Sequence, residues 1–453
     1  MRCDVLIIGG GPGGASAAKA AKITYPDKDV LIVSGNRNAA KPCGIPYMFT
    51  TLADPRENAA NLDALTSMGI RILFDHALKV RYKDRVVECK DHEIAYEKLV
   101  LATGSKPNTL RCEGTDLPGV FSIHKDFEHI RTVREAYGSA RDIVIVGGGY
   151  VGVELAYEFA RHPDKRVTVV EYCEHVLSHS YDEDLARYIH EALASRSVRL
   201  MTGVGVECIE DEDGKHVRLS NGESLPADLV IVSVGAHPNV DLAINSGFDL
   251  KDGFIEVDDY QRTRYPDVYA VGDCAHKTDF LTGKPCGIML ATAAVLEGRI
   301  CGENLYAIAS PRPLRGVIGT STTNLDELTF ASSGITEEDA KKSGFSFVSV
   351  MLRTDHEHPC SLPSDDHQVL VKALFLTESR SIIGVQLMGS DHGRVEELAN
   401  MANVLIQNRM TIDSMLGLQT ASHPYLSGSL ITHPLVAAAE IATDALRSKR
   451  KWM

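Results

Sequence analysis

The fold is decided by residues 4–18, which read Asp4-Val5-Leu6-Ile7-Ile8-Gly9-Gly10-Gly11-Pro12-Gly13-Gly14-Ala15-Ser16-Ala17-Ala18. The apolar run before the glycines predicts a buried strand, and the alanine-rich run after them predicts a helix. Gly9, Gly11 and Gly14 fit the pattern G-x-G-x-x-G, in which the glycines allow a tight turn, close approach of a pyrophosphate and close packing of helix on strand. The stretch therefore predicts a Rossmann-type dinucleotide site, with Pro12 in the turn that receives the phosphates.

The same pattern occurs a second time, in residues 143–152, which read Ile-Val-Ile-Val-Gly-Gly-Gly-Tyr-Val-Gly. A single glycine-rich match is a weak signal, but two strand-turn-helix matches in one chain predict two bound dinucleotides. The second set of contacts comprises Gly147, Gly149, Tyr150 and Gly152.

The residues after the second strand of each repeat indicate which nucleotide binds. Glu171 lies 171 minus 152, or 19, residues beyond the last glycine of the second motif, where an acid binds both hydroxyls of an unphosphorylated ribose and repels a 2′-phosphate. The second site therefore favours NAD(H) over NADP(H). In the first repeat Ser34 stands near the expected acid, and Ser34 or Asn36 is expected to bond the ribose more weakly.

Length and composition describe an ordinary globular chain. The 453 residues are 44% hydrophobic and 24% charged, which predicts two to four domains. The net charge of 47 minus 61, or -14, disfavours nucleic acid and anionic membranes as partners. No apolar run approaches the roughly 18 residues of a membrane span, so we expect a cytoplasmic protein. The ten cysteines include no C-x-x-C pair, so neither a disulfide scaffold nor a cysteine-ligated metal site is predicted.

The next informative segment is Lys41-Pro42-Cys43-Gly44-Ile45-Pro46-Tyr47. Here the sequence resembles the flavin-dependent pyridine nucleotide-disulfide oxidoreductases, in their single-cysteine branch of NADH oxidases, coenzyme A-disulfide reductases and persulfide reductases. Two-cysteine reductases place a partner five residues on, where this chain has Met48, so an internal redox disulfide is excluded. A cysteine at a helix start near Lys41 favours a thiolate that attacks or holds sulfur, although an inert thiol in a turn is the alternative.

The resemblance assigns further residues to two cofactors, FAD and NAD(H). It implies that the loop Ala102-Thr103-Gly104, the Gly272-Asp273 pair and the helix that includes Ala291 contact FAD, with Asp273 on the ribityl chain. Gly235 lies in the strand and crossover that return to the flavin domain. Glu154 matches the acid that faces the nicotinamide, although it is equally compatible with an ordinary helix carboxylate.

The expected fold class is α/β, with two Rossmann-like domains and an α+β C-terminal domain that pairs two subunits. By resemblance, residues 1–113 and 237–315 form the FAD-binding domain, residues 114–236 the NAD(H)-binding domain and residues 316–453 the dimerisation domain. We also expect a helix over residues 54–71 and an amphipathic helix over residues 393–409.

The C-terminal tail departs from the family pattern. Where coenzyme A-disulfide reductases carry Tyr-Ala-Pro-Pro, this chain has Ala421-Ser422-His423-Pro424-Tyr425. His423 is either a proton donor in catalysis or a packed tail residue. The segment 355–360, Asp-His-Glu-His-Pro-Cys, suggests a metal, but a solvated loop is favoured because no fourth ligand is matched to it.

Two functions remain open from the sequence. The first is a homodimeric NADH-dependent reductase of a disulfide, persulfide, polysulfide or oxygen, in which NADH reduces FAD and Cys43 relays electrons to sulfur. The second is an electron-transfer subunit that handles FAD and NAD(H) beside iron-sulfur subunits of a 2-oxoacid or aldehyde oxidoreductase. The altered tail favours the second, whereas the intact Cys-Gly-Ile-Pro-Tyr segment favours the first. A nucleotide-sensing protein has no support beyond the glycine motifs.

Overall fold

The computed structural model of the chain describes residues 1–60, 62–354, 368–390, 392–421 and 433–450. It divides into two compact units. The first comprises Met1–Arg111, Pro118–Ser139 and Val232–Val317, and the second comprises Cys112–Leu117, Ala140–Ile231 and Ile318–Met453. The expected fold class, α/β with an α+β C-terminal part, is confirmed by these elements, whereas the division into three domains stays a prediction.

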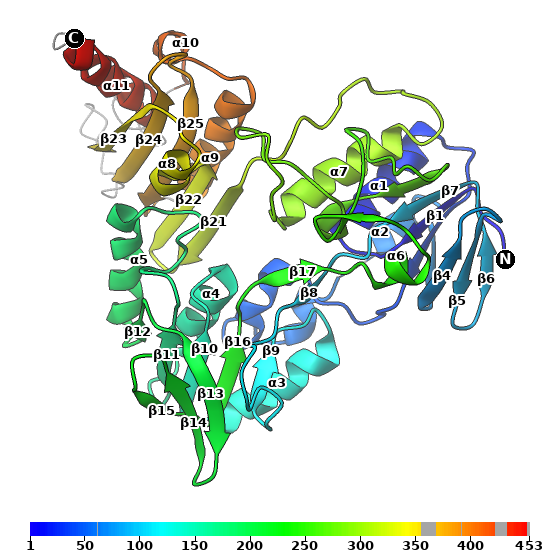
Figure 1. Cartoon of the computed structure of the whole chain (residues 1–453), viewed down its shortest axis with the longest axis horizontal. Coiled ribbons are helices and arrows are strands. Elements are labelled where there is room, and N and C mark those ends of the chain that lie inside the picture. Colours follow the sequence, from blue (N-terminus) through cyan, green and yellow to red (C-terminus); the bar gives the residue numbers. More distant parts are fainter. Residues whose placement is uncertain (61, 355–367, 391, 422–432, 451–453) are drawn as a thin grey trace. The chain divides into compact units, whose positions relative to one another are not determined.

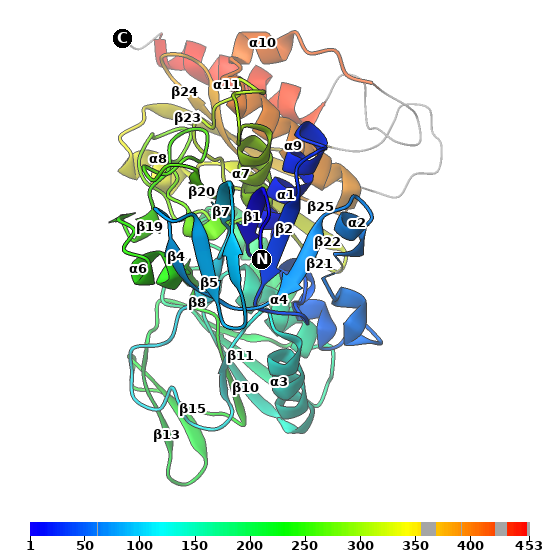
Figure 2. The same cartoon turned by 90° about the vertical axis from the view of Figure 1, so that its right-hand side faces the viewer.

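The first unit is organised around a parallel five-stranded sheet in the order β20-β7-β1-β2-β3 (Figure 2). In register, Val5 pairs with Val30 on one side and with Lys98 on the other. All four residues of β1 are buried, as the covered faces of a parallel sheet require. The strands are β1 (Val5–Ile8), β2 (Val30–Ser34), β3 (Arg71–Phe74), β7 (Lys98–Leu101) and β20 (Val268–Ala270).

Helix α1 (Pro12–Thr24) covers this sheet and packs lengthwise on α7 (Ala291–Glu303) (Figure 1). The two helices approach closely because both carry small residues. A Cβ on Gly298 would lie 2.2 Å from the carbonyl oxygen of Gly13, and a Cβ on Gly302 would lie 2.4 Å from that of Ala17. Neither glycine of α7 therefore tolerates even a methyl group without movement of the α1 backbone.

The rest of the first unit consists of shorter elements. They are η1 (Pro42–Gly44), η2 (Pro46–Met48), η3 (Pro55–Asn58), α2 (Asp63–Thr66), β4 (Ala77–Arg81), β5 (Val86–Cys89), β6 (Glu93–Ala95), β8 (Ser105–Pro107), β9 (Val120–Ser122), α3 (Phe127–Ser139), β17 (Ala236–Pro238), α6 (Asp241–Asn245), β18 (Leu250–Lys251), β19 (Phe254–Ile255) and η4 (Gly272–Cys274). Strands β4, β5 and β6 form an antiparallel meander, and β8 pairs with β17.

The helix expected over residues 54–71 is wrong. The described residues of this segment, 54–60 and 62–71, form only the 3₁₀ turn η3 and the one-turn helix α2 before β3 begins at Arg71. Asp54 accepts a hydrogen bond from the amide of Arg56 and starts a short turn, and Gly69 has φ +80°, which ends a helix. Local turn chemistry therefore outweighs the helical pattern.

The second unit begins with another parallel sheet, whose strands run in the order β12-β11-β10-β16. Its C-terminal part is an antiparallel sheet in the order β21-β22-β25-β24-β23, with α9 against β22 and β25, and α11 against β23 and β24. The elements are β10 (Asp142–Val146), α4 (Tyr150–Phe159), β11 (Arg166–Val170), α5 (Glu183–Ser195), β12 (Arg199–Met201), β13 (Val206–Asp211), β14 (Lys215–Leu219), β15 (Ser224–Pro226), β16 (Leu229–Val232), β21 (Thr320–Leu325), β22 (Leu328–Gly334), α8 (Glu337–Lys342), β23 (Phe347–Thr354), β24 (Val369–Leu376), β25 (Ile382–Gly389), α9 (His392–Gln407), α10 (Ile412–Leu416) and α11 (Pro434–Arg450). Helix α9 confirms the amphipathic helix expected over residues 393–409.

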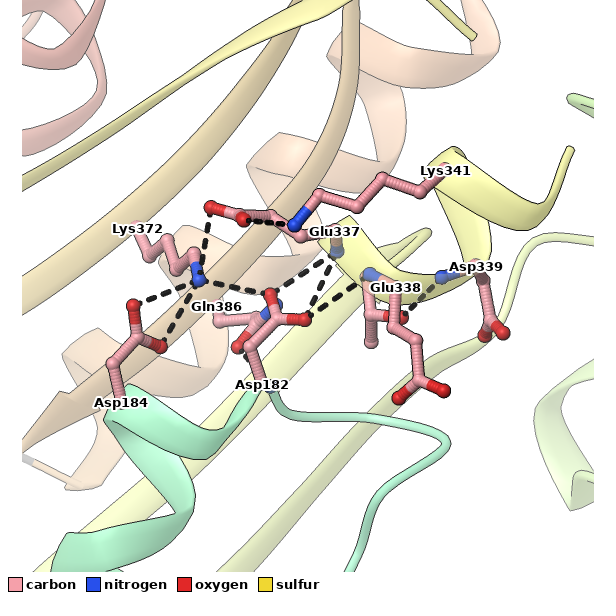
Figure 3. Close-up of polar contacts among 9 residues, drawn as sticks. Asp182, Asp184, Glu337, Glu338, Asp339, Lys341, Lys372 and Gln386 are labelled. Carbon is pink, nitrogen blue, oxygen red and sulfur yellow. Dashed lines mark hydrogen bonds and ion pairs between the residues drawn. The ribbon is translucent and has the colours of Figure 1, made fainter. Parts of the chain in front are cut away.

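A buried lysine joins the two parts of the second unit (Figure 3). The side chain of Lys372 on β24 is 3% exposed, and its Nζ lies 3.0 Å from Asp182, 2.8 Å from Asp184 and 3.1 Å from Glu337. Gln386 on β25 donates to Asp182 at 2.6 Å, and the Asp182 amide donates back to the Gln386 side chain at 2.8 Å. This cluster ties the start of α5 to the C-terminal sheet and to α8.

No helix in the described part of the chain has the length and apolar character that crossing a bilayer requires.

The contact of α1 with α7 predicts the effect of a single methyl group. We expect Gly298→Ala to lower the free energy of unfolding by about 1–3 kcal/mol, because the new Cβ would overlap the carbonyl oxygen of Gly13. The matched control is Gly138→Ala at the end of α3, where no atom lies within 4 Å of the added Cβ. Urea denaturation of both variants measures the difference, and equal midpoints would contradict the proposed packing.

The Lys372 cluster predicts that removal of the ammonium group lowers the free energy of unfolding by an amount that depends on pH. Burial tends to raise the pKa of Glu337, but hydrogen bonds from Ser349 and Lys372 outweigh it and hold this pKa below its ordinary value. A lowered carboxyl pKa stabilises the fold above the unfolded pKa of the group, and this stabilisation is lost as pH falls through the folded pKa. We expect Lys372→Met to lower the free energy of unfolding by about 3–5 kcal/mol at neutral pH, with a smaller deficit in acid.

The control for this prediction is Lys341→Met. Lys341 pairs with the same Glu337 at 3.3 Å, but its side chain is 67% exposed, so we expect a loss of no more than about 0.5 kcal/mol. Denaturation of both variants at neutral and acidic pH tests the contrast, and similar losses in the two variants would refute it.

Candidate active site

The two glycine turns have the same backbone conformation. The first glycines, Gly9 and Gly147, have φ +116° and +104°, which favours glycine. Gly11 precedes α1 with φ -71° and ψ -178°, and Gly149 precedes α4 with φ -74° and ψ -177°. Neither helix start has a side-chain cap, so the sequence repeat corresponds to a structural repeat.

The space around the first turn fits a phosphate ligand. A Cβ on Gly9 would lie 2.1 Å from the carbonyl oxygen of Ala102, and one on Gly14 would lie 2.0 Å from that of Gly9. A Cβ on Gly11 or Gly149 would instead meet no atom within 4 Å. The outer glycines therefore serve backbone packing, and the middle ones leave open room at a helix N-terminus, where a pyrophosphate binds. Pro12 and Tyr150 are the first residues of α1 and α4; in the second turn Gly152 is buried in α4.

Glu171 is held at the carboxyl end of β11, facing the second turn. Its carboxylate accepts hydrogen bonds from the amide of Gly148 at 2.5 Å and from that of Cys173 at 2.7 Å. A Cβ on Gly148, which the motif leaves unspecified, would lie 2.7 Å from the Val176 side chain and 3.0 Å from that of Glu171, so a larger residue here would displace one of them. The carboxylate is thereby oriented before any ribose binds. In the first unit, Ser34 donates at 3.1 Å to the carbonyl oxygen of Asn36, and its role toward a ribose stays a prediction.

Asp273 lies in the 3₁₀ turn η4 after β20, next to Gly272, whose φ is +78°. Ser105 donates to the Asp273 carboxylate at 2.7 Å, and the ammonium of Lys125 lies 3.9 Å from it. A carboxylate supported in this way can still accept further hydrogen bonds, as the predicted contact with a ribityl chain requires.

A buried ion pair supports the same turn, and sequence reasoning missed it. Glu297 on α7 accepts a hydrogen bond from the Gly272 amide at 2.6 Å, while Lys277 donates to the Gly272 carbonyl oxygen at 2.9 Å. The two charged groups lie 3.4 Å apart, with side chains 1% and 2% exposed. Burial raises the pKa of Glu297 to about 7 against the lowering effect of Lys277. No sequence motif includes Lys277 or Glu297, and the two residues come from different elements of the chain.

The Ala102-Thr103-Gly104 loop and the segment after Gly235 are hydrogen-bonded to one another. Thr103 donates to the carbonyl oxygen of Asn239 at 2.6 Å, the Asn239 amide donates to that of Gly104 at 2.8 Å, and the Asn108 amide donates to that of Gly235 at 3.0 Å. These bonds fix both predicted flavin loops in the first unit. Ala291 is the first residue of α7.

Cys43 is exposed and lies in η1, a single 3₁₀ turn, rather than at the start of a longer helix. Asn58 holds the turn by donating to the Lys41 carbonyl oxygen at 2.9 Å and to the sulfur of Met48 at 3.2 Å. A Cβ on Gly44 would lie 2.0 Å from the Asn58 side chain, so glycine is required after the cysteine. Sequence reasoning did not identify Asn58.

The Cys43 segment is also linked to the surroundings of Asp273. The amide of Ala40 donates to the Lys125 carbonyl oxygen at 3.0 Å, and the Lys125 side chain reaches toward Asp273. All of these residues belong to the first unit. Lys125 therefore links the segment with the predicted nucleophile to the turn with the predicted ribityl contact.

Glu154 lies one turn into α4 with its side chain partly buried. Its Oε1 accepts a hydrogen bond from Thr323 of β21 at 2.8 Å, and Tyr150, at the start of the same helix, bonds Ser321 at 2.5 Å. Burial raises the pKa of Glu154 to about 7. Neither Thr323 nor Ser321 was expected from the sequence, because the motif names only the residues on the helix.

His423 and the segment 355–360 lie outside the described residues, so their predicted roles stay predictions. Among the described residues, no group of three or more histidine, cysteine, aspartate or glutamate side chains is arranged to hold a metal ion.

Comparison with known proteins gives matches along almost the whole chain. Residues 3–298 match the pyridine nucleotide-disulphide oxidoreductase family, and residues 321–434 match its dimerisation domain. An NADH oxidase from Enterococcus faecalis is 30% identical over 91% of this chain and 93% of its own length. A CoA-dependent NAD(P)H sulfur oxidoreductase from Pyrococcus abyssi is 30% identical over 97% of this chain and 98% of its own length.

A solved structure of an NAD-dependent persulfide reductase from A. fulgidus superposes with a TM-score of 0.89 at 26% identity, covering 99% of this chain and 84% of that one. The resemblance predicted from the glycine turns, Cys43 and the Gly272-Asp273 pair is confirmed. The chain belongs to the pyridine nucleotide-disulphide oxidoreductase family.

Proposed function

We propose that this FAD-dependent NAD(P)H oxidoreductase takes electrons from NADH and delivers them through Cys43 to a disulfide, persulfide or polysulfide, with oxygen as the second candidate acceptor. The observation that carries the proposal is the exposed, lone Cys43 in a turn built around it, on the same unit as the elements proposed to bind FAD. Relatives named as NADH oxidase and as CoA-dependent sulfur oxidoreductase support the two acceptor classes.

FAD, when bound, supplies the redox chemistry between nicotinamide and sulfur. Residues 1–113 and 237–315 would hold it, with the first glycine turn on the pyrophosphate and Asp273 on the ribityl chain. Ser105 and Lys125 keep the Asp273 carboxylate in place. The open space at Gly11 is the structural support for this fit.

Residues 114–236 would hold NADH, with the second glycine turn on its pyrophosphate. The two amides that orient Glu171 leave lone pairs of the carboxylate free for the ribose hydroxyls. A 2′-phosphate would meet this negative charge at short range, so NADH is the proposed donor.

On the sulfur side, Cys43 acts as the nucleophile. Its thiolate attacks one sulfur of a disulfide RSSR, forms a mixed disulfide and releases RS⁻, which takes up a proton. Two electrons that originate from NADH then cleave the mixed disulfide and restore Cys43. The sum is NADH + H⁺ + RSSR → NAD⁺ + 2 RSH. Position 48 is a methionine whose sulfur accepts a hydrogen bond from Asn58, so no second cysteine at that position competes with the mixed disulfide.

We further propose a homodimer, because residues 321–434 match a dimerisation domain, and a cytoplasmic location. The electron-transfer subunit beside iron-sulfur partners is the less favoured candidate. The relatives that cover nearly the whole chain are named as NADH oxidase and sulfur oxidoreductase, and nothing in the described residues favours an iron-sulfur partner.

Cys43→Ser tests the sulfur relay. We expect turnover of a disulfide or polysulfide to fall by roughly 1,000-fold or more, because the covalent step is lost. Anaerobic reduction of bound FAD by NADH should continue, because the hydride donor does not contact the thiol in this scheme. Flavin absorbance and thiol release measure the two half-reactions.

The control is Cys208→Ser, a partly exposed cysteine in β13, which should retain both half-reactions. Undisturbed sulfur turnover in Cys43→Ser, together with an iron-sulfur protein that copurifies with the native enzyme, would overturn the proposal in favour of the electron-transfer subunit.

Glu171→Ser tests the choice of nucleotide. Loss of charged hydrogen bonds to the ribose should raise the KM for NADH by about 10–100-fold, while the KM for NADPH should fall because the repulsion is removed. Steady-state kinetics with both donors measure the ratio. Glu174→Gln, a neighbouring acid that faces Gly203, should leave the ratio close to that of the wild type, and a similar loss of NADH preference in both variants would contradict the assignment of Glu171.

A further inference from the structure

Two side chains on one face of helix α4 are hydrogen-bonded to two side chains of strand β21. Tyr150 bonds Ser321 at 2.5 Å, and Glu154 accepts from Thr323 at 2.8 Å. Beyond the helix end, Arg161 pairs with Asp326 just after the strand. Residues four apart lie on one helix face, and residues two apart lie on one strand face. The helix that begins at the second glycine turn is therefore set against the C-terminal sheet in a fixed register.

Thr323 occupies the central position of this contact. Its residue is 4% exposed, so its hydroxyl has little access to water and is committed to Glu154. The neighbouring residue Thr322 is exposed and donates at 3.1 Å to the carbonyl oxygen of Phe330 within the sheet. The two adjacent threonines thus differ in their hydrogen bonds: the Thr323 hydroxyl bonds α4, and the Thr322 hydroxyl bonds within the sheet.

The surroundings of Glu154 disfavour its charge. Burial raises its pKa to about 7, and the negative charge of Glu158 on the same helix acts in the same direction. Tyr181, completely buried before α5, is a further titratable group that interacts with Glu154. The hydrogen bond from Thr323 acts in the opposite direction and favours the carboxylate. Strands β10 and β11 and helix α5 also pack on α4. The only charged residues of the two strands are Asp142 and Arg166 at their first positions, and the buried residues of α5 are all apolar.

We propose that Thr323 is a positioning residue for hydride transfer. Its hydroxyl, supplied by the C-terminal sheet, holds the Glu154 carboxylate in one orientation and in its ionised form, beside the nicotinamide. The inference rests on the proposed function and on the prediction that Glu154 faces the nicotinamide. A carboxylate beside the ring stabilises the positive charge that the nicotinamide acquires as hydride leaves. A protonated Glu154 provides no such stabilisation, so the hydroxyl of Thr323 favours hydride transfer at neutral pH.

The test uses the FAD-loaded full chain and three variants. Thr323→Val keeps the shape but removes the donor, Thr323→Ser restores a hydroxyl, and Thr322→Val is the matched control on the opposite face of the strand. The rate of anaerobic flavin reduction by saturating NADH is measured by stopped flow between about pH 5 and pH 9. The concentration dependence gives the apparent Kd for NADH at each pH.

Loss of the donor should raise the pH at which the reduction rate reaches half of its maximum by about one pH unit, because a hydrogen bond to a charged group stabilises it by that order. At neutral pH the Thr323→Val rate should fall several-fold, with recovery at high pH. Thr323→Ser should restore the wild-type profile, and Thr322→Val should match it. A purely structural role would lower the rate at every pH alike, and that result would overturn the proposal.

A second measurement keeps the inference separate from the proposed function. Infrared difference spectra across the same pH range report protonation of Glu154 directly, with Glu154→Gln used to assign the carboxyl band. We expect that band to titrate at higher pH in Thr323→Val than in the wild type, whether or not NADH reduces the flavin. Wild-type protein whose flavin is never reduced by NADH would refute the proposed function, whereas an unmoved band would refute the role of Thr323. If Thr323→Val does not fold, Thr323→Ala is measured in its place with the same expectations.

Discussion

The first unit depends on a few glycines that approach the backbone of a neighbouring element so closely that no side chain fits between them. Gly9 approaches the Ala102 carbonyl so closely that a Cβ would overlap it, and Gly14 stands in the same relation to Gly9. Gly298 repeats the arrangement against Gly13. Strand β1, helix α1 and helix α7 are thus joined by direct backbone approach, which leaves the amides at the start of α1 open for a phosphate.

Three buried sites contain charged side chains, and the groups that compensate the charge differ from one site to the next. Around Lys372, three carboxylates surround one cation, and the Gln386 amide bonds one of them. Beneath the Gly272-Asp273 turn, a single Glu297–Lys277 pair is completed by backbone groups. Among the described residues Glu154 is hydrogen-bonded by one threonine hydroxyl and forms no ion pair. Because uncompensated charge is costly in a poorly solvated site, the protonation of Glu154 depends on that single hydroxyl, which suits a residue expected to face a ligand of variable charge.

The sequence was sufficient for those features whose physical cause is local. Both glycine turns, the strands beside them and the helix from Ala291 follow from residues adjacent in the chain, and all are present. The segment 54–71 failed because Asp54 and Gly69 impose turns that helical periodicity does not reveal. Asn58, Lys277, Glu297 and Thr323 were missed for another reason. None of the four belongs to a motif, and their contacts with Lys41, Gly272 and Glu154 form only when the chain folds.

The cluster around Lys372 affects where the chain can be cut into fragments. Asp182 and Asp184 come from the part of the chain with the second glycine turn, whereas Lys372 and Gln386 come from the C-terminal sheet. A fragment cut before β21 would retain the two aspartates but lose the ammonium that neutralises them and the amide that hydrogen-bonds Asp182. The part of the chain from β10 to β16 and the C-terminal sheet therefore share one charge cluster, and a chimera with another C-terminal sheet would need a matching cation at the position of Lys372.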